Sequence, residues 1–323
     1  MSKAIIIHEL GGPEVMTLED RAVPRPGPGQ ILVEQKAAGL NFIDVYFRTG
    51  VYKAELPLVL GKEGAGVVAG IGEGVTRFAV GDRVAYNGAV GAYAEHVVIA
   101  ADAAAKLPDA VSFETAAASM LKGMTAEYLL RRTYKVGPGT VLLFHAAAGG
   151  VGLIAGQWAK HLGATVIGTA GSPEKCALAL RHGYDHVIDY TREDFVARVS
   201  EITDGRKCDV VYDSVGRDTF PKSLDCLRRQ GLWASFGQSS GTIPPFDLAI
   251  LNQKGSLFAT RPSLFGYTAT RPEFEESSNA LFDMIASGAV TIPIGQSYPL
   301  AEAATAHRDL ESRKTTGATI LTI

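Results

Sequence analysis

The stretch "HAAAGGVGLIAGQWAK", from His145 to Lys160, decides the fold of this chain. It follows the apolar run "VLLF" and has the spacing of the dinucleotide-binding fingerprint G-x-G-x-x-G, with Ala147, Gly149 and Gly152 at the three positions. In that fingerprint the first glycine forms a tight turn, the second lets the backbone approach a pyrophosphate, and the third lets the helix pack on the strand. A strand, a turn and a helix that offers its N-terminal amides to a pyrophosphate are therefore predicted here.

The same region raises a second interpretation, because residues 136–159 contain no Asp, Glu, Lys or Arg and are long enough to span a membrane. Glycines interrupt the segment, "KVGPGT" precedes its apolar part, and "VLLF" is typical of a strand rather than a helix. The pattern therefore favours a buried strand, turn and helix over a membrane span.

From residue 141 onward, short apolar strands alternate with helical stretches, which predicts a doubly wound parallel α/β sheet of the Rossmann type. The predicted strands are residues 141–145, 165–169, 186–189, 209–213, 232–237 and 256–260. The predicted helices between them are residues 151–161, 173–181, 192–202 and 219–229.

The first 120 residues have a different pattern. Strand-like runs such as "AIIIHE", "ILVEQKAAG" and "AYAEHVVI" are separated by Gly and Pro clusters and show little helical period, which predicts an antiparallel β-barrel. After about residue 261, one amphipathic helix (272–287) and two strands are too little for a third domain. We therefore expect one domain at 1–124 completed by 265–323, a second at 125–264, and a ligand site in the cleft between them.

Composition sets limits on partners and compartment. The 323 residues carry a formal charge of -3 and no basic run, which argues against binding to nucleic acid or an anionic membrane. The three cysteines are too few and too scattered for a disulfide framework, and "AIII" after Lys3 is too short for a signal-peptide core. We expect a cytoplasmic protein.

The end of the second Rossmann strand indicates which dinucleotide binds. NAD-binding domains usually carry an acidic residue about 20 residues beyond the glycine loop, where it holds the ribose 2′-hydroxyl. This chain has Thr169, Ala170 and Gly171 there, followed by Ser172 and Lys175 at the next helix start. Without a carboxylate to repel it, a 2′-phosphate can be accommodated, so the sequence predicts NADPH rather than NADH.

Motifs along the whole chain carry a resemblance to a known family. They are "NFIDVYFRTG" (41–50), "GKEGAGVV" (61–68), "GDRV" (81–84), "AAASMLKGMTA" (116–126), "HAAAGGVG" (145–152), "VVYDSVG" (210–216), "GQSSG" (237–241) and "NQKGSLFATRPSL" (252–264). In this order they resemble the zinc-independent quinone oxidoreductases, the zeta-crystallin-like branch of the medium-chain dehydrogenase/reductases. The resemblance implies a GroES-like barrel, a Rossmann domain, NADPH in the cleft, and a homodimer formed through the late strand "SLFAT".

Matching residues one by one, the resemblance also implies the cofactor site. The 2′-phosphate partners are Ser172, Lys175, Tyr190 and Arg313, and the pyrophosphate faces Gly149, Gly150 and Val151. Near the ribose and nicotinamide lie Asn41, Thr125, Ser214, Phe236, Ser263 and Leu264. Gly171, Gly237 and Gln238 belong to the same cofactor-binding motifs.

Zinc-dependent relatives ligate a metal at three positions where this chain has Asn41, Lys62 and Leu121. None of these supplies the thiolate or neutral imidazole that zinc prefers, so we expect no metal site. Without a Lewis acid, the substrate must accept hydride unaided. A quinone does so because the product is an aromatic, delocalised hydroquinone anion, and a conjugated enone does so nearly as well.

For the substrate pocket we predict Asn41 as a polar contact and Tyr46 and Tyr52 as aromatic walls, and we assign no general acid. Packing at the barrel edge is the alternative for the two tyrosines. The leading hypothesis is an NADPH-dependent quinone reductase, with an enone reductase as the enzymatic alternative. An RNA-binding or structural role, known in the zeta-crystallin branch, is the alternative from a different class.

Overall fold

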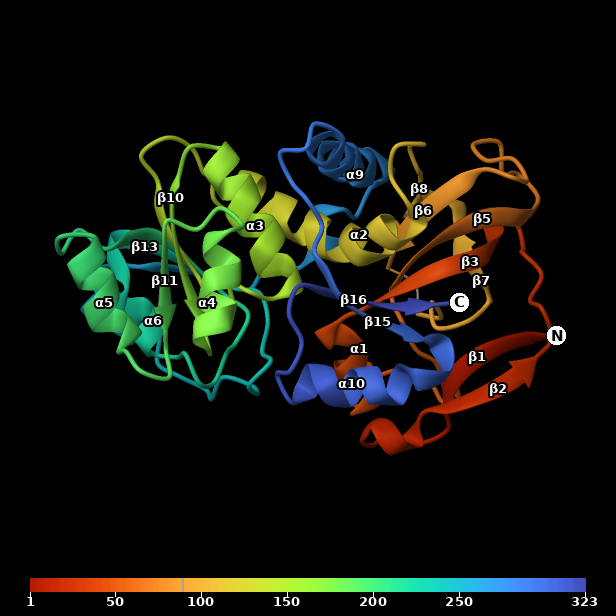
Figure 1. Cartoon of the computed structure of the whole chain (residues 1–323), viewed down its shortest axis with the longest axis horizontal. Helices are drawn as coiled ribbons and strands as arrows, with labels where there is room; N and C mark the ends of the chain where they lie inside the picture. Colours follow the sequence, from red (N-terminus) through yellow and green to blue (C-terminus); the bar gives the residue numbers. More distant parts are fainter. Residues whose placement is uncertain (89) are drawn as a thin grey trace. The chain divides into compact units, whose positions relative to one another are not determined.

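The computed structural model describes residues 1–88 and 90–323, which divide into two compact units. The first unit consists of Met1–Met124, Thr268–Ala286 and Ile292–Ile323, and the second of Thr125–Tyr267 and Ser287–Thr291. The first boundary falls inside the helix α2 (Phe113–Tyr128), and both chain ends lie in the first unit (Figure 1). Residues 265–267 and 287–291, which the sequence-based division assigns to the first domain, group with the second unit.

The second unit is built on a parallel sheet with the strand order β11-β10-β9-β12-β13-β14. Its strands are β9 (Val141–Phe144), β10 (Thr165–Ala170), β11 (His186–Asp189), β12 (Cys208–Asp213), β13 (Leu227–Ser235) and β14 (Phe258–Thr260). Every residue of β12 is buried, as expected for a central parallel strand covered on both faces. The predicted doubly wound α/β architecture is confirmed, in the strand order of dinucleotide-binding domains.

Helices connect these strands, and Figure 1 shows α3 and α4 lying along β10 and β11. The helices of this unit are α3 (Gly150–His161), α4 (Pro173–Leu180), α5 (Phe195–Ile202), α6 (Lys222–Asp225), α7 (Ala249–Gln253), α8 (Leu264–Tyr267) and a π-helical turn, η3 (Leu129–Thr133). The predicted helix 219–229 is wrong beyond Asp225. Leu227 pairs with Cys208 of β12, so the chain enters the sheet directly.

The first unit contains two sheets among its described residues, with strand orders β2-β1-β4 and β15-β16-β3-β5-β6-β8; β7 also pairs with β3. The strands are β1 (Ser2–Ile7), β2 (Thr17–Arg21), β3 (Gln30–Leu40), β4 (Leu58–Val59), β5 (Glu63–Ile71), β6 (Arg83–Asn87), β7 (His96–Ala100), β8 (Ala104–Lys106), β15 (Ile294–Pro299) and β16 (Ala318–Thr322). As expected, the last strands return to this unit, because Thr319 of β16 pairs with Leu40 of β3.

Helices in the first unit are more extensive than the strand-rich sequence suggests. They are α1 (Phe42–Arg48), part of α2, α9 (Arg271–Ala286), α10 (Ala303–Glu311) and the 3₁₀ turns η1 (Pro13–Val15), η2 (Ala101–Ala103) and η4 (Leu300–Glu302). The helix α1 has seven residues, too few to show a helical period, and begins with a capping box formed by Asn41 and Asp44. This short helix carries the candidate residue Tyr46 and is capped by another, Asn41.

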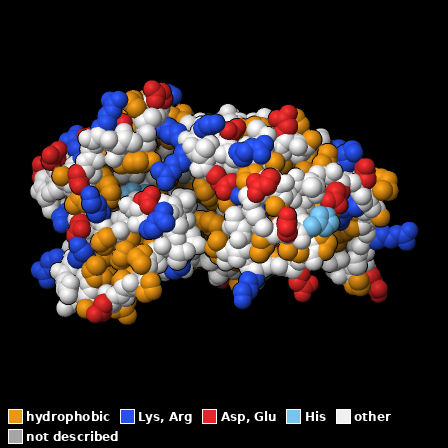
Figure 2. Space-filling view, turned by 90° about the horizontal axis from the view of Figure 1, so that it is seen from below, with side chains coloured by type: hydrophobic (Ala, Val, Ile, Leu, Met, Phe, Trp, Pro, Cys, Tyr) orange, Lys and Arg blue, Asp and Glu red, His pale blue; other side chains and the backbone are white. Residues whose placement is uncertain are grey.

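The surface is mixed in charge. On the face shown in Figure 2, Lys and Arg side chains alternate with Asp and Glu rather than gathering in one basic patch. Within residues 1–88 and 90–323, no helix is both long and apolar enough to cross a membrane.

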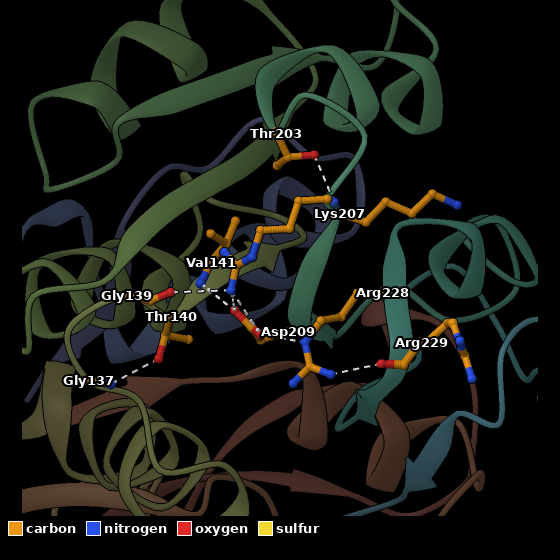
Figure 3. Close-up of polar contacts among 10 residues, drawn as sticks. Gly137, Gly139, Thr140, Val141, Thr203, Lys207, Asp209, Arg228 and Arg229 are labelled. Atoms are coloured by element: carbon orange, nitrogen blue, oxygen red, sulfur yellow. Dashed lines mark hydrogen bonds and ion pairs between the residues drawn. The ribbon is translucent and has the colours of Figure 1, made fainter.

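At the amino end of β12, the buried Asp209 fixes three segments of the second unit (Figure 3). Its carboxylate accepts hydrogen bonds from the Val141 amide (2.8 Å), from Nε of Arg228 (2.6 Å) and from Arg206 (3.0 Å). Burial alone raises the pKa of this carboxyl, but the Val141 amide and the two arginines outweigh it and leave the pKa below its usual value. This cluster holds the amino edge of the sheet and leaves ligand binding to the opposite edge.

Candidate functional site

The candidate cofactor residues of the second unit lie mostly in loops that directly follow strands. Because the six strands are parallel, their carboxyl ends form one edge of the sheet. Gly149, Gly150 and Val151 follow β9; Gly171 and Ser172 follow β10; Tyr190 follows β11; Ser214 follows β12; Phe236, Gly237 and Gln238 follow β13; Ser263 and Leu264 follow β14. Lys175 lies in the first turn of α4 and Thr125 in α2. The structure therefore brings these loops to one edge.

The glycine loop has the geometry that its sequence predicts. A Cβ on Gly152 would lie 2.5 Å from the Ala146 carbonyl oxygen and 2.6 Å from that of Ala147, so only glycine fits there. Gly149 is the N-cap of α3 and offers no side-chain cap, which leaves the first amides of this 12-residue helix without a side-chain acceptor. A helix start of this kind is suited to a phosphate.

The alanine at the first fingerprint position is accommodated by a second glycine. A Cβ on Gly168, in the neighbouring strand β10, would lie 2.6 Å from the Cβ of Ala147. Gly168 therefore provides the space that the fingerprint normally provides with its own first glycine. Ala147 is fully buried, and its amide donates to the Thr169 carbonyl at 2.9 Å.

A buried polar network lies directly beneath this loop. His145, the residue after β9, contacts Oγ1 of Thr169 at 2.9 Å and Oγ of Ser223 at 3.1 Å. Ser223 donates to Oδ2 of Asp213 at 2.8 Å. Burial lowers the pKa of His145, so the ring is neutral and can both donate and accept. The network ties the ends of β9, β10 and β12 to α6, and so fixes the base of the loop.

Asp213 ends β12 and is held by several donors. Its carboxylate accepts from the amides of Val215 (2.9 Å) and Gly216 (3.1 Å) and from the Thr219 hydroxyl (2.8 Å). Burial raises the pKa of the Asp213 carboxyl, but the opposing effects of His145 and of the hydrogen bonds from Thr219, Gly216 and Ser223 are larger and leave the pKa below its usual value. The following residue, Ser214, approaches Gly237 so closely that a Cβ on Gly237 would lie 2.7 Å from the Ser214 carbonyl oxygen.

The predicted 2′-phosphate residues of the second unit lie at the ends of β10 and β11. Ser172 caps α4 by accepting from the Lys175 amide at 3.3 Å, and a Cβ on Gly171 would lie 2.4 Å from the Tyr190 hydroxyl. One acidic side chain, Glu174, is in the first turn of α4. Hydrogen bonds from its own amide and from the Ser172 side chain lower its pKa, so it is ionised at neutral pH. A phosphate bound here would meet this carboxylate and would need a cation to offset it.

In the first unit, a buried glutamate binds two of the three residues at the positions where zinc-dependent relatives ligate a metal, Asn41 and Leu121. Glu63 is fully buried and accepts from the Leu121 amide (2.7 Å), from Nζ of Lys122 (2.8 Å) and from Nδ2 of Asn41 (2.8 Å). A Cβ on Gly39 would lie 2.3 Å from the Glu63 carboxylate, so this arrangement requires glycine at position 39. Within the described ranges, no three His, Cys, Asp or Glu side chains form a group that could hold a metal ion.

A second buried carboxylate, Asp44 of α1, has a different set of partners. Its Oδ2 accepts from the Asn41 amide (2.9 Å) and from the Tyr93 hydroxyl (2.8 Å), whereas Oδ1 has no hydrogen-bond partner among the described residues. Burial raises the pKa of Asp44 to about 7, against the opposing effects of Tyr93 and the Asn41 amide. Near neutral pH this carboxyl is only partly ionised.

The Asp44 network continues toward the surface. Arg48 donates to Nδ1 of His307 at 2.9 Å, which leaves the proton on Nε2, the atom 3.3 Å from the Tyr93 hydroxyl. Burial and the Arg48 charge lower the pKa of His307 to about 3, so it is neutral. Arg48 also makes two 2.8 Å hydrogen bonds to the partly exposed Glu311.

The two predicted pocket tyrosines belong to one aromatic group. The Tyr46 and Tyr52 rings are edge-on at 5.3 Å, Tyr52 contacts Phe47 at 5.7 Å, and Nζ of Lys62 lies 5.1 Å from the centre of the Phe47 ring. Arg313, also of the first unit, follows α10 with a left-handed backbone (φ 60°). Asn41 starts α1 and is buried.

Sequence reasoning missed Asp44, Glu63 and the His145 to Asp213 network. A signal for the first was present, because Asn41 and Asp44 have the spacing of a capping box just before an apolar run. The Asp44 partner Tyr93 lies 49 residues away (93 − 44), and His307, which contacts Tyr93, lies 263 residues away (307 − 44). No local pattern could connect them.

Comparison with known proteins gives concordant matches. Two family models match: "Alcohol dehydrogenase GroES-like domain" over residues 27–109 and "Zinc-binding dehydrogenase" over residues 150–287. Quinone oxidoreductase from Pseudomonas aeruginosa is 52% identical, and quinone oxidoreductase 1 from Escherichia coli 54% identical, each over 99% of both chains. A 2-haloacrylate reductase from a Burkholderia species is 44% identical over 99% of both chains.

The matching solved structures include the Escherichia coli quinone oxidoreductase complexed with NADPH, which covers 99% of this chain and 100% of its own with a TM-score of 0.98. The words "zinc-binding" in one matched family do not fit this chain's own donors. Asn41 and Lys122 bond Glu63, Leu121 offers only its backbone, and an ammonium at Lys62 cannot ligate a cation.

Proposed function

This chain belongs to the quinone oxidoreductases of the medium-chain dehydrogenase/reductase superfamily, and we propose that it reduces quinones by metal-free hydride transfer from NADPH. The observation that carries the proposal is the carboxyl edge of the Rossmann sheet, where all six strands end in loops with candidate cofactor residues. The full-length relationship to quinone oxidoreductases supports the substrate class.

NADPH, when bound, supplies the hydride. The amides of Gly150 and Val151 at the start of α3 bind its pyrophosphate, and the Gly152 and Gly168 positions keep the loop close enough to do so. Ser172, Lys175 and Tyr190, with Arg313 of the first unit, bind the 2′-phosphate. Thr125, Ser214, Phe236 and the Ser263 to Leu264 backbone hold the ribose and nicotinamide.

The substrate is held by groups of the first unit. The edge-on rings of Tyr46 and Tyr52 offer apolar walls for a planar quinone, and the buried Asn41, which caps the helix of Tyr46, offers a polar contact. Because the donors at the three metal-ligand positions do not suit zinc, the reaction relies on a substrate that becomes an aromatic anion. The Rossmann and barrel units are the cofactor and substrate domains, respectively.

The cofactor assignment is tested by Lys175→Ala. If Lys175 offsets Glu174 and binds the 2′-phosphate, KM for NADPH rises by about 10-fold or more while KM for NADH changes little, since one charge-assisted contact is worth roughly 1.5–3 kcal/mol. Initial rates with both cofactors and a benzoquinone measure this. Equal changes for the two cofactors would remove Lys175 from the 2′-phosphate site.

A reductase of activated alkenes is the second candidate, because a relative named 2-haloacrylate reductase is 44% identical over 99% of this chain. A panel of benzoquinones, naphthoquinones, enones and haloacrylates, each with NADPH, separates the two. A higher kcat/KM for the alkenes would replace the quinone proposal.

We also propose a cytoplasmic homodimer. β14 is an edge strand of the Rossmann sheet, and the side chain of Phe258 on this strand is 63% exposed. Leu248, ten residues earlier in the chain, is 71% exposed. An exposed apolar edge strand is suited to pairing with a second copy. Sedimentation velocity tests the dimer.

The net charge of -3 argues against the RNA-binding alternative. Tight, salt-dependent RNA binding by the purified protein would support that alternative instead.

A further inference from the structure

Large apolar side chains are exposed beside the walls proposed for the quinone. Leu10 is 51% exposed, Val51 52%, Tyr52 36% and Leu56 39%. Single exposed apolar residues are ordinary on a protein surface, but a contiguous group of them usually marks a binding site. The backbone that carries these four side chains decides whether they are contiguous.

The turn after α1 places Val51 between Leu10 and Tyr52. Gly50 has a left-handed backbone (φ 78°), and a Cβ on it would lie 2.6 Å from Cδ1 of Leu10, so the Leu10 side chain lies directly against this turn. The Tyr52 amide donates to the Tyr46 carbonyl at 3.0 Å, which folds the chain back onto α1. Val51 therefore joins the glycine that Leu10 covers to Tyr52.

Hydrogen bonds hold the segment that carries Leu10 against the end of α1. The Gly11 amide donates to the Arg48 carbonyl at 3.1 Å, and Nε of Arg48 donates to the Gly11 carbonyl at 3.1 Å. Arg48 is itself buried and also bonds Glu311. The exposed Leu10 side chain is thus carried by a fixed backbone, so a ligand that binds it has less loop motion to restrict.

Leu56 reaches the same place through the pairing of β1 with β4. These strands are antiparallel, and Ile7 lies opposite Leu58. The chain that leaves β1 toward Leu10 therefore runs beside the chain that enters β4 from Leu56. The four exposed side chains form what we call the apolar surface: Leu10, Val51, Tyr52 and Leu56.

The apolar surface is continuous with the walls proposed for the quinone ring, because Tyr52 belongs to both. The Tyr52 ring is edge-on to Tyr46 at 5.3 Å and to Phe47 at 5.7 Å. A substituent that extends from a ring bound at Tyr52 toward Val51 meets Val51 first and Leu10 next. The apolar surface is therefore placed to contact a side chain of the substrate.

The charges of the carrying segments favour an uncharged occupant. Residues 8–11 and 50–57 contain one lysine and two glutamates, Lys53, Glu9 and Glu55, which gives a formal charge of −1. Anionic membranes are bound by clusters of Lys and Arg, which these segments do not contain. Four partly exposed side chains are also far fewer than the roughly 20–30 residues that each partner contributes to a stable protein interface. A neutral alkyl or prenyl chain fits both observations.

We propose that the apolar surface binds the apolar tail of the quinone, so that the preferred substrates carry an alkyl or isoprenoid chain on the ring. The inference rests on the proposed quinone reductase activity and adds no chemical step, because hydride still arrives at the ring. Burial of apolar area drives the binding of the tail. A fully buried methylene raises affinity by about 4-fold, and half of that free energy, on a surface open at one side, corresponds to about 2-fold.

The test uses benzoquinones that share one ring and differ only in a methyl, propyl or pentyl chain, each kept below the concentration at which it aggregates. In wild type KM should fall by about 2-fold for each added methylene. kcat should stay nearly constant, because the tail binds equally in the ground state and the transition state. Initial rates with NADPH measure both constants, and a KM that does not depend on chain length would overturn the proposal.

Val51→Ser and Leu10→Ser should each weaken the dependence on chain length. KM for the pentyl quinone should rise by about 3-fold or more in either variant, while KM for the methyl quinone changes little. Val80→Ser is the matched control, because Val80 is 64% exposed in the same unit but lies in the connection between β5 and β6. An equal dependence on chain length in all three variants would contradict the assignment of the tail to this surface.

Binding without turnover is measured by calorimetry with alkyl esters of 4-hydroxybenzoate, which keep a planar ring and lengthen the chain. Kd should fall from the methyl to the pentyl ester in wild type and in Val80→Ser, and much less in Val51→Ser. Wild type that reduces the methyl quinone without favouring longer chains would refute this inference alone. Inactivity toward every quinone would refute the proposed function, and the esters would still show whether the surface binds a tail.

Two further measurements address other occupants of the apolar surface. Flotation with phosphatidylcholine vesicles detects a membrane, and sedimentation velocity detects a second copy of the chain. We expect Val51→Ser to match wild type in both. Loss of vesicle binding or of a dimer in Val51→Ser, with an unchanged dependence on chain length, would assign the surface to that occupant and overturn the proposal.

Discussion

Asp44 in the barrel unit and Asp213 in the Rossmann unit are both buried carboxylates, yet their pKa values shift in opposite directions. Asp213 receives hydrogen bonds from two amides, two hydroxyls and, at 3.4 Å, the Trp233 indole. Among the described residues, Asp44 receives two hydrogen bonds, both on Oδ2, and none on Oδ1. Burial penalises both charges, and the number of donors decides which effect wins.

This difference separates a carboxylate that stays ionised from one that titrates near neutral pH. Donors that fully satisfy Asp213 keep it ionised, and it organises the loop that follows β12 without taking part in proton transfer. Asp44 is held in place by fewer donors, so burial raises its pKa to about 7 and its ionisation responds to pH near neutrality. The same residue type thus ionises differently in its two surroundings.

The largest effect is expected from Asp213→Ala. The change leaves the hydroxyls of Thr219 and Ser223 and the amides of Val215 and Gly216 without their acceptor. We expect the free energy of unfolding to fall by about 3–5 kcal/mol, since each buried unsatisfied group costs roughly 1–3 kcal/mol and neighbouring costs overlap. Both tryptophans, at positions 158 and 233, lie in this unit, so denaturant unfolding followed by tryptophan fluorescence measures the loss.

A matched control for this variant is Glu201→Ala on α5, which removes a 64% exposed ion-pair partner of Arg198. Exposed pairs contribute about 0–1 kcal/mol, so the control should stay close to wild type. If Asp213→Ala were equally mild, the contrast between a satisfied and an unsatisfied carboxylate would lose its basis.

Asp44→Asn should change the pH dependence of stability. Folded Asp44 keeps its proton up to about pH 7, whereas unfolded Asp releases it near pH 3.9. Stability from this group is therefore complete below about pH 4, is lost as pH rises toward 7, and then levels off. The slope is at most about 1.4 kcal/mol per pH unit, and the asparagine, which does not titrate, should abolish it.

Hydrogen exchange of first-unit peptides between pH 5 and 8, corrected for intrinsic exchange, measures this slope locally. Wild type should lose protection relative to Asp44→Asn as pH rises. Parallel curves for the two proteins would mean that Asp44 is ionised throughout, and the comparison with Asp213 would fail.

The features that the sequence predicts correctly are those that depend on residues close together in the chain. The Rossmann strands, the glycine loop and the helix starts at Ser172 and Asp194 depend on neighbours a few residues away, and the sequence predicts them within a few positions. The helix predicted at 219–229 failed beyond Asp225 because pairing of Leu227 with Cys208 overrides helical propensity.

The candidate site shows the same limit. Tyr46 and Tyr52 are close in sequence and were predicted as a pair. In contrast, the contacts of Asp44 with Tyr93 and of His145 with Ser223 join distant segments. Ala147 and Gly168 are an intermediate case. The loop pattern marks Ala147 as unusual, but only the strand pairing of β9 with β10 shows that Gly168 makes room for it.

The smallest effect is expected from Ser223→Ala. This variant removes one hydrogen-bond donor from Asp213 and so makes its surroundings more like those of Asp44. Asp213 loses one donor and keeps Thr219, two amides and the Trp233 indole, so at neutral pH we expect the free energy of unfolding to fall by about 1 kcal/mol. The depressed pKa of Asp213 contributes stability above the unfolded pKa that is lost as pH falls through the folded pKa. With one donor fewer that folded pKa rises, so acid unfolding should begin at a higher pH in the variant. Tryptophan fluorescence measured from pH 7 to 3 detects this shift of the acid transition. The control Thr219→Ser keeps the hydroxyl donor and should not show the shift. An unchanged acid transition in Ser223→Ala would mean that the number of donors does not set the ionisation of these buried carboxylates.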